Sequence, residues 1–389
     1  MIKRILCVEA TRKGVQGGSH RCLYELVKGL DRSKYEPIVL LYSDVPIRQE
    51  FKKVCKVIMI EKKDRGRSHK GHLRPSRVRT MGRLLSDLFF TILPGTRALY
   101  RIIRQERIDI VHLNNALGMA PEGTLAAKLC GIPCVVHQRA MGKVYRIARF
   151  QSKYVDALIC ISDAVRTFYM TEEVSPKRIL RIYDGIDVLP TDATVSSEMM
   201  RRHLGIESDR PIVGVVGTIQ PWKGQREVIL AVRQLKNRYP NIRCLIVGEI
   251  FNRDYHREIS KLVEELELNG NVCFLGYRED VLDLMNAMDI VIHSSTLPEP
   301  FGRVLIEAMA LGKPIIATRG GGPLEIVEDH FTGLLVPPGD PEALASAVTR
   351  LVENGMLSAK MGQAGRERVK QLFTLESTIL ETEKIYAQL

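Results

Sequence analysis

The most restrictive feature of this sequence is a regular alternation: short runs of β-branched residues are separated by stretches whose apolar residues recur at helical spacing. A short apolar run suits a strand buried on both faces, and a helix is the usual crossover between two parallel strands. The alternation therefore predicts an α/β fold with doubly wound parallel sheets. The predicted strands of the first half are Ile5–Val8, Glu36–Leu41, Cys55–Ile60, Ile110–Leu113, Cys134–His137, Ala157–Ile161 and Arg178–Ile182. Those of the second half are Ile212–Val216, Cys244–Val247, Val272–Leu275, Ile290–His293, Pro314–Ala317 and Gly333–Val336.

The chain is too long for a single core. Its 389 residues, 45% of them hydrophobic, exceed the size at which one hydrophobic core usually stops growing. The polar, irregular segment 188–208 is the weakest region between the two sets of strands, so we place the domain border there, at Pro190. We expect a first Rossmann-like domain at residues 1–190, a second at 191–374 and a final helix at 375–389. Ligands of such sheets bind at the carboxyl ends of the strands.

Charge is distributed unevenly over the two halves. Residues 1–190 carry a net charge of +17 and residues 191–389 a net charge of −5, which gives +12 for the chain. A basic domain favours an anionic partner such as nucleic acid, a membrane surface or a phosphorylated small molecule. Net charge does not choose among these partners, so the choice depends on motifs.

The cysteines and the first residues indicate a compartment. The eight cysteines contain no CxxC pair and lie mostly in apolar runs, as expected for buried thiols in a reducing environment. Met1 is followed at once by a predicted strand and not by the apolar segment of a secretory signal, and the apolar stretch Leu84–Leu93 is too short to span a membrane. We therefore expect a cytoplasmic protein.

The segment PEPFGRVLIEAMALGKP at residues 298–314 carries most of the chemistry. Glu299 lies in a Pro-flanked loop after a predicted strand, and Glu307 lies one turn into the next helix with its side chain pointing back toward the N-terminus. The first amides of that helix form a site for a phosphate. They belong to Phe301, Gly302 and Arg303. A nucleotide-diphosphate sugar has a ribose diol at one end, a diphosphate in the middle and sugar hydroxyls at the other end. A phosphate site between two carboxylates that accept hydrogen bonds from hydroxyl groups matches this layout. The alternative is a capped helix with surface glutamates.

A second motif, GTIQPWKG at residues 217–224, follows the predicted strand Ile212–Val216. Lys223 precedes a helix, and its ammonium group is placed to act as a point charge on a leaving phosphate. The alternative is an ordinary solvated lysine at the start of a helix.

Four blocks make the second half resemble the retaining glycosyltransferases of family 4. They are residues 217–224, residues 299–307, GGGPLEIV at 320–327 and GLLVPPGDP at 333–341. The resemblance extends more loosely over the whole chain and implies the GT-B fold, in which two Rossmann-like domains face each other across a cleft and the last helix returns to the first domain. It also implies that Glu299 contacts the donor sugar, that Glu307 contacts the ribose, and that Lys223 and the Phe301–Gly302 loop bind the diphosphate.

Thr218 departs from the family pattern, because members usually carry an arginine directly after the first glycine of the 217–224 block. Either another arginine compensates, or the donor is bound more weakly than in relatives. The candidates for compensation are Arg12, Arg139 and Arg319.

The first predicted strand is followed by a glycine-rich loop. Gly17 and Gly18 allow the backbone to approach a ligand closely, and Ser19 is a candidate N-cap for the next helix. The resemblance places Gly17 and Gly18 beside the donor phosphates and Ser19 and Arg139 on the acceptor side. It places His137 near the transferred sugar. The alternatives are a tight turn for the loop and a structural role for the histidine.

The sequence contains no Asp-x-Asp pair and no His/Cys cluster at metal-ligand spacing. Charge on a leaving diphosphate must then be met by Lys223, loop amides and a helix dipole. We therefore expect no metal and no cofactor. The resemblance implies retention by front-face attack, in which a phosphate oxygen helps to take the acceptor proton.

A basic segment at residues 62–83 precedes an amphipathic stretch that ends at Leu93. Basic residues beside an apolar helix face suit an anionic membrane surface, whereas the alternative is a helix packed on its own sheet below a solvated loop. Nucleic acid is disfavoured because the basic stretch contains few aromatic residues and no known binding motif. The basic residues are Lys62, Lys63, Arg65, Arg67, Lys70, Arg74, Arg77, Arg79 and Arg83.

Together these motifs and the resemblance to family 4 imply a metal-independent, retaining glycosyltransferase of the hexosyltransferase type. It would move a sugar from a nucleotide-diphosphate sugar to an acceptor hydroxyl, and a lipid-linked or cell-surface polysaccharide precursor is the candidate acceptor. The enzyme would be cytoplasmic, with the inner face of the membrane as a candidate peripheral site. The alternatives are another GT-B enzyme of nucleotide sugars, an epimerase or a phosphorylase, and a catalytically silent GT-B binding protein, which Thr218 favours.

Overall fold

The computed structural model describes residues 2–11, 17–60, 88–187, 194–207 and 210–389. The chain divides into unit 1, Met1–Tyr183 with Leu375–Leu389, and unit 2, Asp184–Thr374. The division falls several residues before the border expected at Pro190. The reason is that Ile186 already bonds within unit 2, where its N–H donates to the Phe373 carbonyl at 2.9 Å. The basic segment 62–83 lies outside the described residues.

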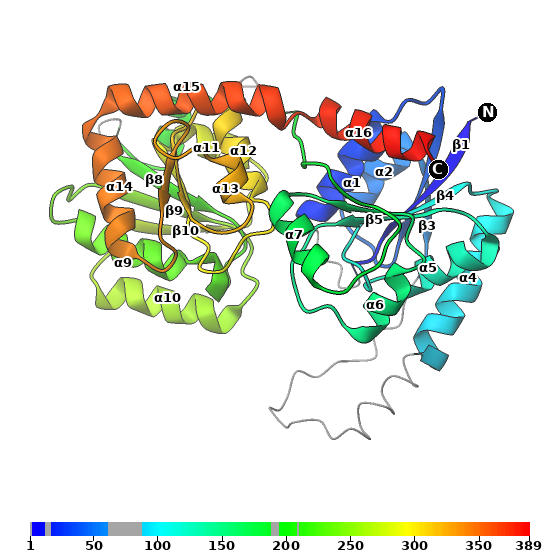
Figure 1. Cartoon of the computed structure of the whole chain (residues 1–389). Coiled ribbons are helices and arrows are strands. Elements are labelled where there is room, and N and C mark those ends of the chain that lie inside the picture. Colours follow the sequence, from blue (N-terminus) through cyan, green and yellow to red (C-terminus); the bar gives the residue numbers. More distant parts are fainter. Residues whose placement is uncertain (1, 12–16, 61–87, 188–193, 208–209) are drawn as a thin grey trace. The chain divides into compact units, whose positions relative to one another are not determined.

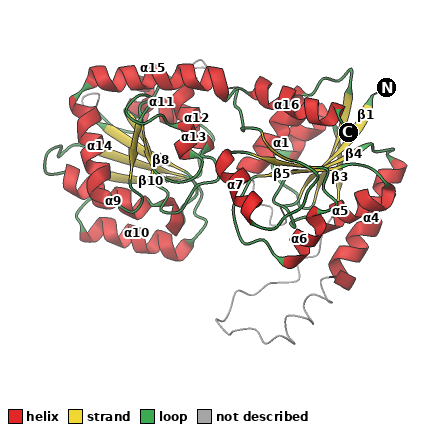
Figure 2. Ribbon diagram, viewed as in Figure 1, coloured by secondary structure: helices red, strands yellow, loops and turns green. Residues whose placement is uncertain are grey.

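Unit 1 is built on a seven-stranded sheet with the order β3-β2-β1-β4-β5-β6-β7, in which all neighbouring strands are parallel (Figures 1 and 2). The strands are β1 (Lys3–Glu9), β2 (Tyr35–Leu41), β3 (Lys56–Met59), β4 (Ile110–Leu113), β5 (Cys134–Gln138), β6 (Ala157–Cys160) and β7 (Ile179–Arg181). Strands β4, β5 and β6 are buried along their whole length. Burial on both faces explains why continuous apolar runs, without alternation, mark these strands.

Helices cover this sheet and connect its strands. They are α1 (Gly18–Gly29), α2 (Arg48–Val54), α4 (Leu93–Gln105) with the π-helical turn η1 (Leu88–Ile92) before it, α5 (Pro121–Cys130), α6 (Arg146–Ser152), α7 (Asp163–Thr171) and α16 (Leu375–Ala387). Helix α1 buries Leu23, Leu26 and Val27 in the core of unit 1. These positions recur at helical spacing, so the apolar face of α1 is continuous.

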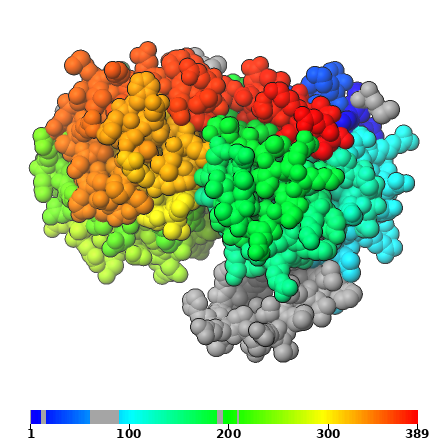
Figure 3. Space-filling model, in the orientation of Figure 1, coloured from blue at the N-terminus to red at the C-terminus, as the bar shows by residue number. Residues whose placement is uncertain are grey.

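The last helix, α16, belongs to unit 1 and packs beside α1 (Figures 1 and 3). Tyr386 of α16 is fully buried, and its hydroxyl hydrogen-bonds His112 Nδ1 at 2.6 Å. The backbone N–H of Asp31 donates to the Glu383 carboxylate at 2.7 Å, and Lys3 Nζ donates to the Tyr386 carbonyl at 2.9 Å. The C-terminal helix is therefore part of the core of unit 1.

Unit 2 is built on a six-stranded parallel sheet with the order β10-β9-β8-β11-β12-β13. Its strands are β8 (Ile212–Val216), β9 (Arg243–Val247), β10 (Val272–Gly276), β11 (Ile290–His293), β12 (Ile315–Thr318) and β13 (Leu334–Val336). Every predicted strand of both units is present, with ends that differ by at most two residues. The prediction of two doubly wound parallel sheets is confirmed.

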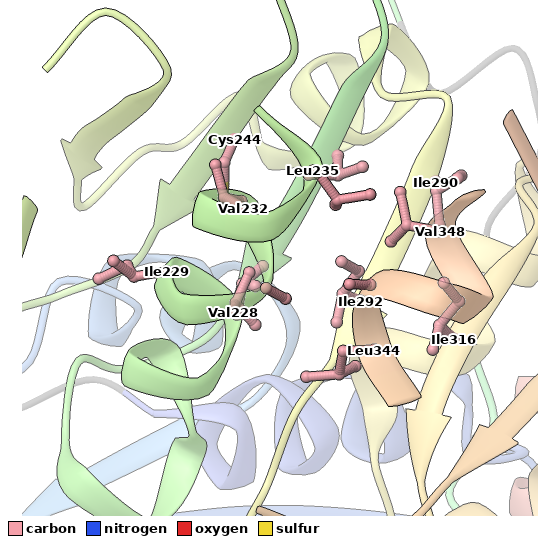
Figure 4. Close-up of a cluster of buried hydrophobic side chains, with 14 of the residues drawn as sticks. Val228, Ile229, Val232, Leu235, Cys244, Ile290, Ile292, Ile316, Leu344 and Val348 are labelled. Carbon is pink, nitrogen blue, oxygen red and sulfur yellow. The ribbon is translucent and has the colours of Figure 1, made fainter. Parts of the chain in front are cut away.

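The helices of unit 2 enclose its core. They are α8 (Ser197–His203), the 3₁₀ turn η3 (Pro221–Lys223), α9 (Gln225–Leu235), α10 (Arg253–Glu265), α11 (Val281–Ala287), α12 (Arg303–Ala310), α13 (Pro323–Ile326), α14 (Pro341–Glu353) and α15 (Gly355–Leu372). Figure 4 shows Val228 and Val232 of α9 with Leu344 and Val348 of α14 around strand residues such as Ile292. Removing these side chains from water is the main stabilising contribution to the unit.

Both sheets reverse their winding direction beside the first strand of the unit. In unit 1, β2 and β4 lie on opposite sides of β1, and in unit 2, β9 and β11 lie on opposite sides of β8. Loops that leave neighbouring strands at such a reversal go to opposite faces of the sheet, which leaves room for a ligand at the carboxyl ends. Functional residues are therefore expected after β8 and β11 in unit 2, and after β1 and β4 in unit 1.

Candidate functional site

The loop after β8 places Lys223 at the point where the sheet of unit 2 reverses. The 3₁₀ turn η3 ends at Lys223, and Gly224 follows with φ +70°. A Cβ on Gly224 would lie 1.9 Å from the carbonyl oxygen of Ser294, and the Ser294 hydroxyl donates to the Lys223 carbonyl at 2.9 Å. This glycine therefore lets the turn approach the chain that leaves β11, which brings Lys223 close to the residues after that strand.

The loop after β11 carries Glu299, and the glycine block after β12 supports it. Glu299 pairs with Gly321 in a parallel bridge, and the Gly322 N–H donates to the Glu299 carbonyl at 2.8 Å. Gly321 has φ +71°, and a Cβ there would lie 2.1 Å from the Glu299 carbonyl oxygen. The GGGPLEIV block, which the sequence offered only as a family signature, thus lets a second loop pack directly against the backbone of Glu299.

Lys223 and Glu299 form an ion pair. The ammonium nitrogen lies 2.7 Å from Glu299 Oε2 and 4.1 Å from the centre of the Trp222 ring. The side chains of Lys223 and Glu299 are 20% and 12% exposed, so the pair is shielded from water without being closed off. Two residues that the sequence suggested from separate motifs therefore meet in one site.

Two more donors reach the same carboxylate oxygen. Ser295 Oγ donates to Glu299 Oε2 at 2.9 Å, and His293 Nε2 lies 3.3 Å from it. Burial alone would raise the pKa of Glu299, but the hydrogen bond from His293 and the charge of Lys223 outweigh burial and lower the pKa to about 2. Glu299 is therefore a carboxylate across the physiological pH range. His293 and Ser295 were not singled out from the sequence, although His293 ends β11 and Ser295 lies two residues beyond it.

The start of α12 brings Arg303 and Glu307 together. Arg303 is the first residue of the helix, and its Nε donates to Glu307 Oε1 at 2.8 Å, one turn further on. Gly302 precedes the helix with φ +110°, and the Phe301 side chain is buried against Phe373 with ring centres 5.9 Å apart. Phe301 can therefore serve a ligand only through its backbone, as the sequence interpretation assumed. The Arg303–Glu307 pairing was not predicted.

A cavity of ≈ 600 Å³ opens at the carboxyl ends of β9 and β10, along the same edge of the sheet as Lys223 and Glu299. Its lining residues are Glu249, Ile250, Arg253, His256, Arg257, Gly276 and Tyr277. The Tyr277 side chain is 63% exposed, and the two arginines supply positive charge. Sequence reasoning missed this cavity, although Glu249 and Tyr277 come just after predicted strands.

Thr218 lies in the loop between β8 and Lys223, and its contacts are local. Its hydroxyl accepts a hydrogen bond from Gln220 Nε2 at 2.8 Å, and its carbonyl accepts one from Gln225 Nε2 at 3.0 Å. Of the arginines considered as substitutes for the missing cation, Arg319 pairs with Asp329, Arg139 lies in unit 1 and Arg12 is outside the described residues. Arg303, at the start of α12, is the arginine that unit 2 places beside the predicted site residues.

In unit 1 the glycine loop begins helix α1. Gly17 is the N-cap, and Gly18 is the first helical residue. The expectation that Ser19 caps the helix is wrong: the Gly17 N–H instead bonds His20 Nδ1 at 3.2 Å, and Ser19 lies inside the first turn. Among the described residues, no atom lies within 4 Å of a Cβ built at Gly17 or Gly18, so these residues leave both backbones open to a ligand.

A polar network at the ends of β1 and β4 lies beside this loop. Asn114 Nδ2 donates to Glu9 Oε2 at 2.7 Å and to the Ser19 carbonyl at 2.9 Å, and Asn115 Nδ2 donates to Glu9 Oε1 at 2.6 Å. Glu9 is 1% exposed. Sequence reasoning missed this network. The signal was present, because Glu9 ends one strand and Asn114 follows another.

Arg139 and His137 complete this edge of unit 1. Arg139 Nε donates to Asn114 Oδ1 at 3.2 Å, and Arg139 Nη2 lies 3.4 Å from His137 Nδ1. His137 is fully buried and its ring packs on His112, with ring centres 5.5 Å apart. Burial and the neighbouring Arg139 lower the pKa of His137 well below its usual value, so this side chain is neutral. Arg139 is half-buried, which leaves it as the more accessible of the two.

Two general properties of the described residues bear on the site. Within the ranges that the structure covers, no group of three or more His, Cys, Asp or Glu side chains could hold a metal ion. Among the same residues, no helix is both long and apolar enough to cross a membrane.

Known families match both halves of the chain. Residues 16–188 match the model described as Glycosyltransferase Family 4, and residues 196–368 match the model described as Glycosyl transferases group 1. The lipopolysaccharide core biosynthesis glycosyltransferase LpsE of Rhizobium meliloti is 31% identical over 46% of this chain and 50% of its own length. The match thus spans only half of that relative. N-acetyl-alpha-D-glucosaminyl L-malate synthase of Bacillus anthracis is 27% identical over 73% of this chain and 76% of its own.

Solved structures resemble the whole chain. HepE of Anabaena, crystallised with UDP-glucose, has a TM-score of 0.81 and 25% identity, and the match covers 99% of this chain and 100% of HepE. Sucrose-phosphate synthase of Thermosynechococcus elongatus has a TM-score of 0.78 at 22% identity over 99% of this chain and 98% of its own, which shows a common GT-B fold. Two glycosyltransferase profiles that follow each other along the chain, together with a GT-B fold over its full length, show that the chain belongs to glycosyltransferase family 4.

Proposed function

We propose that this protein transfers a glycosyl residue from a nucleotide-diphosphate sugar to a hydroxyl group of an acceptor. The observation that carries the proposal is the Lys223–Glu299 pair at the reversal point of the unit 2 sheet, 2.7 Å apart and largely shielded from water. An ionised carboxylate next to a cation suits a substrate with hydroxyl groups on one part and a phosphate on the next. HepE, which shares the fold over its whole length, binds UDP-glucose, and this supports the choice of donor.

The rest of the donor would lie along the same edge of the sheet. We place the nucleoside in the cavity after β9 and β10, where Tyr277 offers an exposed ring and Arg253 and Arg257 offer positive charge. The diphosphate would meet Lys223 and the backbone at the start of α12, whose dipole favours an anion. Glu307 would accept hydrogen bonds from the ribose, as the family resemblance implies.

The proposed reaction retains the configuration of the transferred sugar. The bond between the anomeric carbon and the diphosphate breaks, and the electron pair leaves with the phosphate oxygen. The acceptor oxygen bonds the anomeric carbon from the same side, and its proton passes to that phosphate oxygen. Lys223 would stabilise the developing negative charge, and Glu299 would hold the sugar hydroxyls.

Unit 1 would bind the acceptor. Ser19 and Arg139 lie at its carboxyl edge, and both contact Asn114 of the polar network. The open backbones of Gly17 and Gly18 are suited to a phosphate of the donor. His137 is buried, so we propose that it supports Arg139 and not that it touches the sugar. Relatives named for lipopolysaccharide core biosynthesis and for galactosyl transfer to GlcNAc-diphosphoundecaprenol support a lipid-linked or cell-surface polysaccharide precursor as the acceptor.

Turnover should not require a divalent metal. Lys223, the loop amides and the α12 dipole would supply the positive charge that a metal ion supplies in other transferases. We expect nucleotide release from the donor to continue in excess EDTA at the rate seen without it. Loss of turnover in EDTA that added magnesium or manganese restores would contradict this expectation.

We also propose that unit 1 docks on an anionic membrane at the cytoplasmic face. Helix α4 and the turn before it expose Phe90, Leu93 and Tyr100, and α4 contains no acidic residue. Three arginines on α4, Arg97, Arg101 and Arg104, are exposed beside these apolar groups. Apolar groups flanked by cations suit the boundary between lipid headgroups and acyl chains.

Liposome cosedimentation tests this docking. Each basic residue near an anionic surface contributes about 1 kcal/mol, so changing the three arginines of α4 to glutamate should reduce binding to anionic vesicles at low salt by at least about tenfold. The matched control carries the same change at exposed basic residues of unit 2, Arg202, Arg233 and Lys261, and should bind like the wild type. Equal binding to neutral and anionic vesicles would refute the proposal.

Product analysis tests the proposed transfer itself. Nuclear magnetic resonance of the products separates transfer to a hydroxyl from epimerisation of the bound sugar and from phosphorolysis to a sugar phosphate. Binding of a nucleotide sugar without any turnover would favour a silent binding protein, the role to which Thr218 points.

A further inference from the structure

Three side chains hold the same oxygen of Glu299. Lys223 Nζ lies 2.7 Å, Ser295 Oγ 2.9 Å and His293 Nε2 3.3 Å from Oε2. Within the described residues no hydrogen bond reaches the other oxygen, Oε1. The carboxylate is therefore anchored by one oxygen and can offer the other one to a ligand.

His293 is built into the sheet, whereas Lys223 is not. His293 is the last residue of β11, is 6% exposed and lies opposite Ala317 of β12. Its Nδ1 is buried and has no partner among the described residues, so the ring makes its hydrogen bonds through Nε2 alone. A proton on Nε2 fits this arrangement, because the N–H then points at a carboxylate.

The hydrogen bonds from His293 and Ser295 would outlast the one from Lys223 when a ligand binds. An ammonium group on a flexible four-carbon chain can turn toward a phosphate, and a diphosphate beside Glu299 would attract it. Glu299 would then lose its hydrogen bond from Lys223 while the donor is bound, when the carboxylate has to face the sugar. The imidazole has no comparable freedom, because its backbone belongs to a buried strand.

We propose that His293 is a positioning residue, which holds Glu299 through Oε2 so that Oε1 faces the sugar of the donor. The role of Oε1 rests on the proposed transferase function, whereas the bond from His293 to Glu299 does not. The His293 hydrogen bond is also one of the interactions that lower the pKa of Glu299 to about 2, against the effect of burial. Among the described residues, the titratable groups that contact Glu299 are Lys223 from the loop after β8 and His293 from β11, while Arg303 and Glu307 pair with each other on α12.

Three substitutions of His293 separate this role from a packing role. Leucine fills the site without a donor, glutamine places an amide N–H close to the position of Nε2, and asparagine places one close to Nδ1. With UDP-glucose as the probe, we expect His293→Leu and His293→Asn to lower kcat for UDP release by about tenfold or more, as for a lost hydrogen bond to a charged group. His293→Gln should stay within about threefold of the wild type. The donor KM should change less than kcat in all three.

The carboxyl carbon of Glu299, followed by nuclear magnetic resonance in glutamate-labelled protein without ligand, gives a readout that needs no activity. Its signal is assigned by its loss in Glu299→Gln. We expect no titration of the wild type or His293→Gln between pH 4.5 and pH 8, in keeping with a pKa of about 2. His293→Leu should shift the start of titration upward into this range. Burial raises the pKa of Glu299, and the variant lacks the His293 hydrogen bond that opposes this rise. His203→Leu, an exposed histidine on α8, is the control and should match the wild type.

The outcomes distinguish the two claims. If wild-type protein turns over no nucleotide sugar, the proposed function fails, and the Glu299 titration still decides whether His293 holds the carboxylate. If wild-type protein is active and the leucine variant keeps its kcat and its flat titration, His293 has no positioning role. Equal losses in the glutamine, asparagine and leucine variants would show a packing role and would also overturn the inference.

Discussion

Replacing Lys223 with methionine is expected to lower kcat/KM for the nucleotide sugar by about 10²–10³-fold, the range for losing one preorganised group that stabilises developing charge. Methionine keeps much of the apolar stem and removes the charge, which lies 4.1 Å from the centre of the Trp222 ring. The pH dependence should change as well, because the Lys223 charge is one of the interactions that lower the pKa of Glu299. Without it, the acid limb of the kcat/KM profile should move to higher pH.

Steady-state kinetics across pH, with circular dichroism as a check of folding, provide the measurement. The control is Lys261→Met, because Lys261 is an exposed lysine of α10 in the same unit. If Lys223→Met and the control are equally active, Lys223 is an ordinary solvated lysine and the assignment fails.

Replacing Glu299 with glutamine is expected to cut turnover by more than about tenfold while the chain stays folded. The amide has the shape of the carboxylate, but it presents two N–H donors in place of one oxygen and carries no charge for Lys223. Lys223 would then be partly buried without its counter-ion, so both the sugar and the phosphate ends of the site would be affected.

The stability of this variant should depend on pH in a defined direction. The pKa of Glu299 is lowered from 4.5 to about 2, so the charged form stabilises the fold above about pH 4.5, and this contribution is lost as the pH falls toward 2. The difference in melting temperature between wild type and Glu299→Gln should therefore be largest near neutral pH and shrink below pH 4.5. Near-normal transfer by a folded Glu299→Gln protein would refute the role of this residue.

The sequence was sufficient to predict the framework of the fold. Strands such as Ile212–Val216 and Ile290–His293 are buried on both faces, and this burial produces the continuous apolar runs by which they were identified. The order of these strands places Lys223 and Glu299 at the reversal point of the sheet. That these two side chains form an ion pair could not be predicted, because they are 76 positions apart and depend on how two loops pack.

Residues that act through contacts with other segments were missed for the same reason. His293 was identified only as the end of a strand, and the network of Glu9 with Asn114 joins positions 105 apart. Ser19 was expected to cap α1, but the backbone at Gly17 and the ring of His20 make that cap. Local propensity favours serine at an N-cap. In this helix the N-cap is Gly17, and its N–H is bound by the ring of the buried His20, three residues after Gly17.

Calorimetric titration with a panel of UDP-, ADP-, GDP- and dTDP-sugars tests the central claim most directly, because the claim is that unit 2 binds a nucleotide sugar at Lys223 and Glu299. One member of the panel should bind the wild type with a stoichiometry of one, and Lys223→Met should bind it at least about tenfold more weakly, a difference of about 1.4 kcal/mol. Lys261→Met should match the wild type. The account would be contradicted if no nucleotide sugar binds the folded protein, or if the affinity is the same with and without the Lys223 ammonium group.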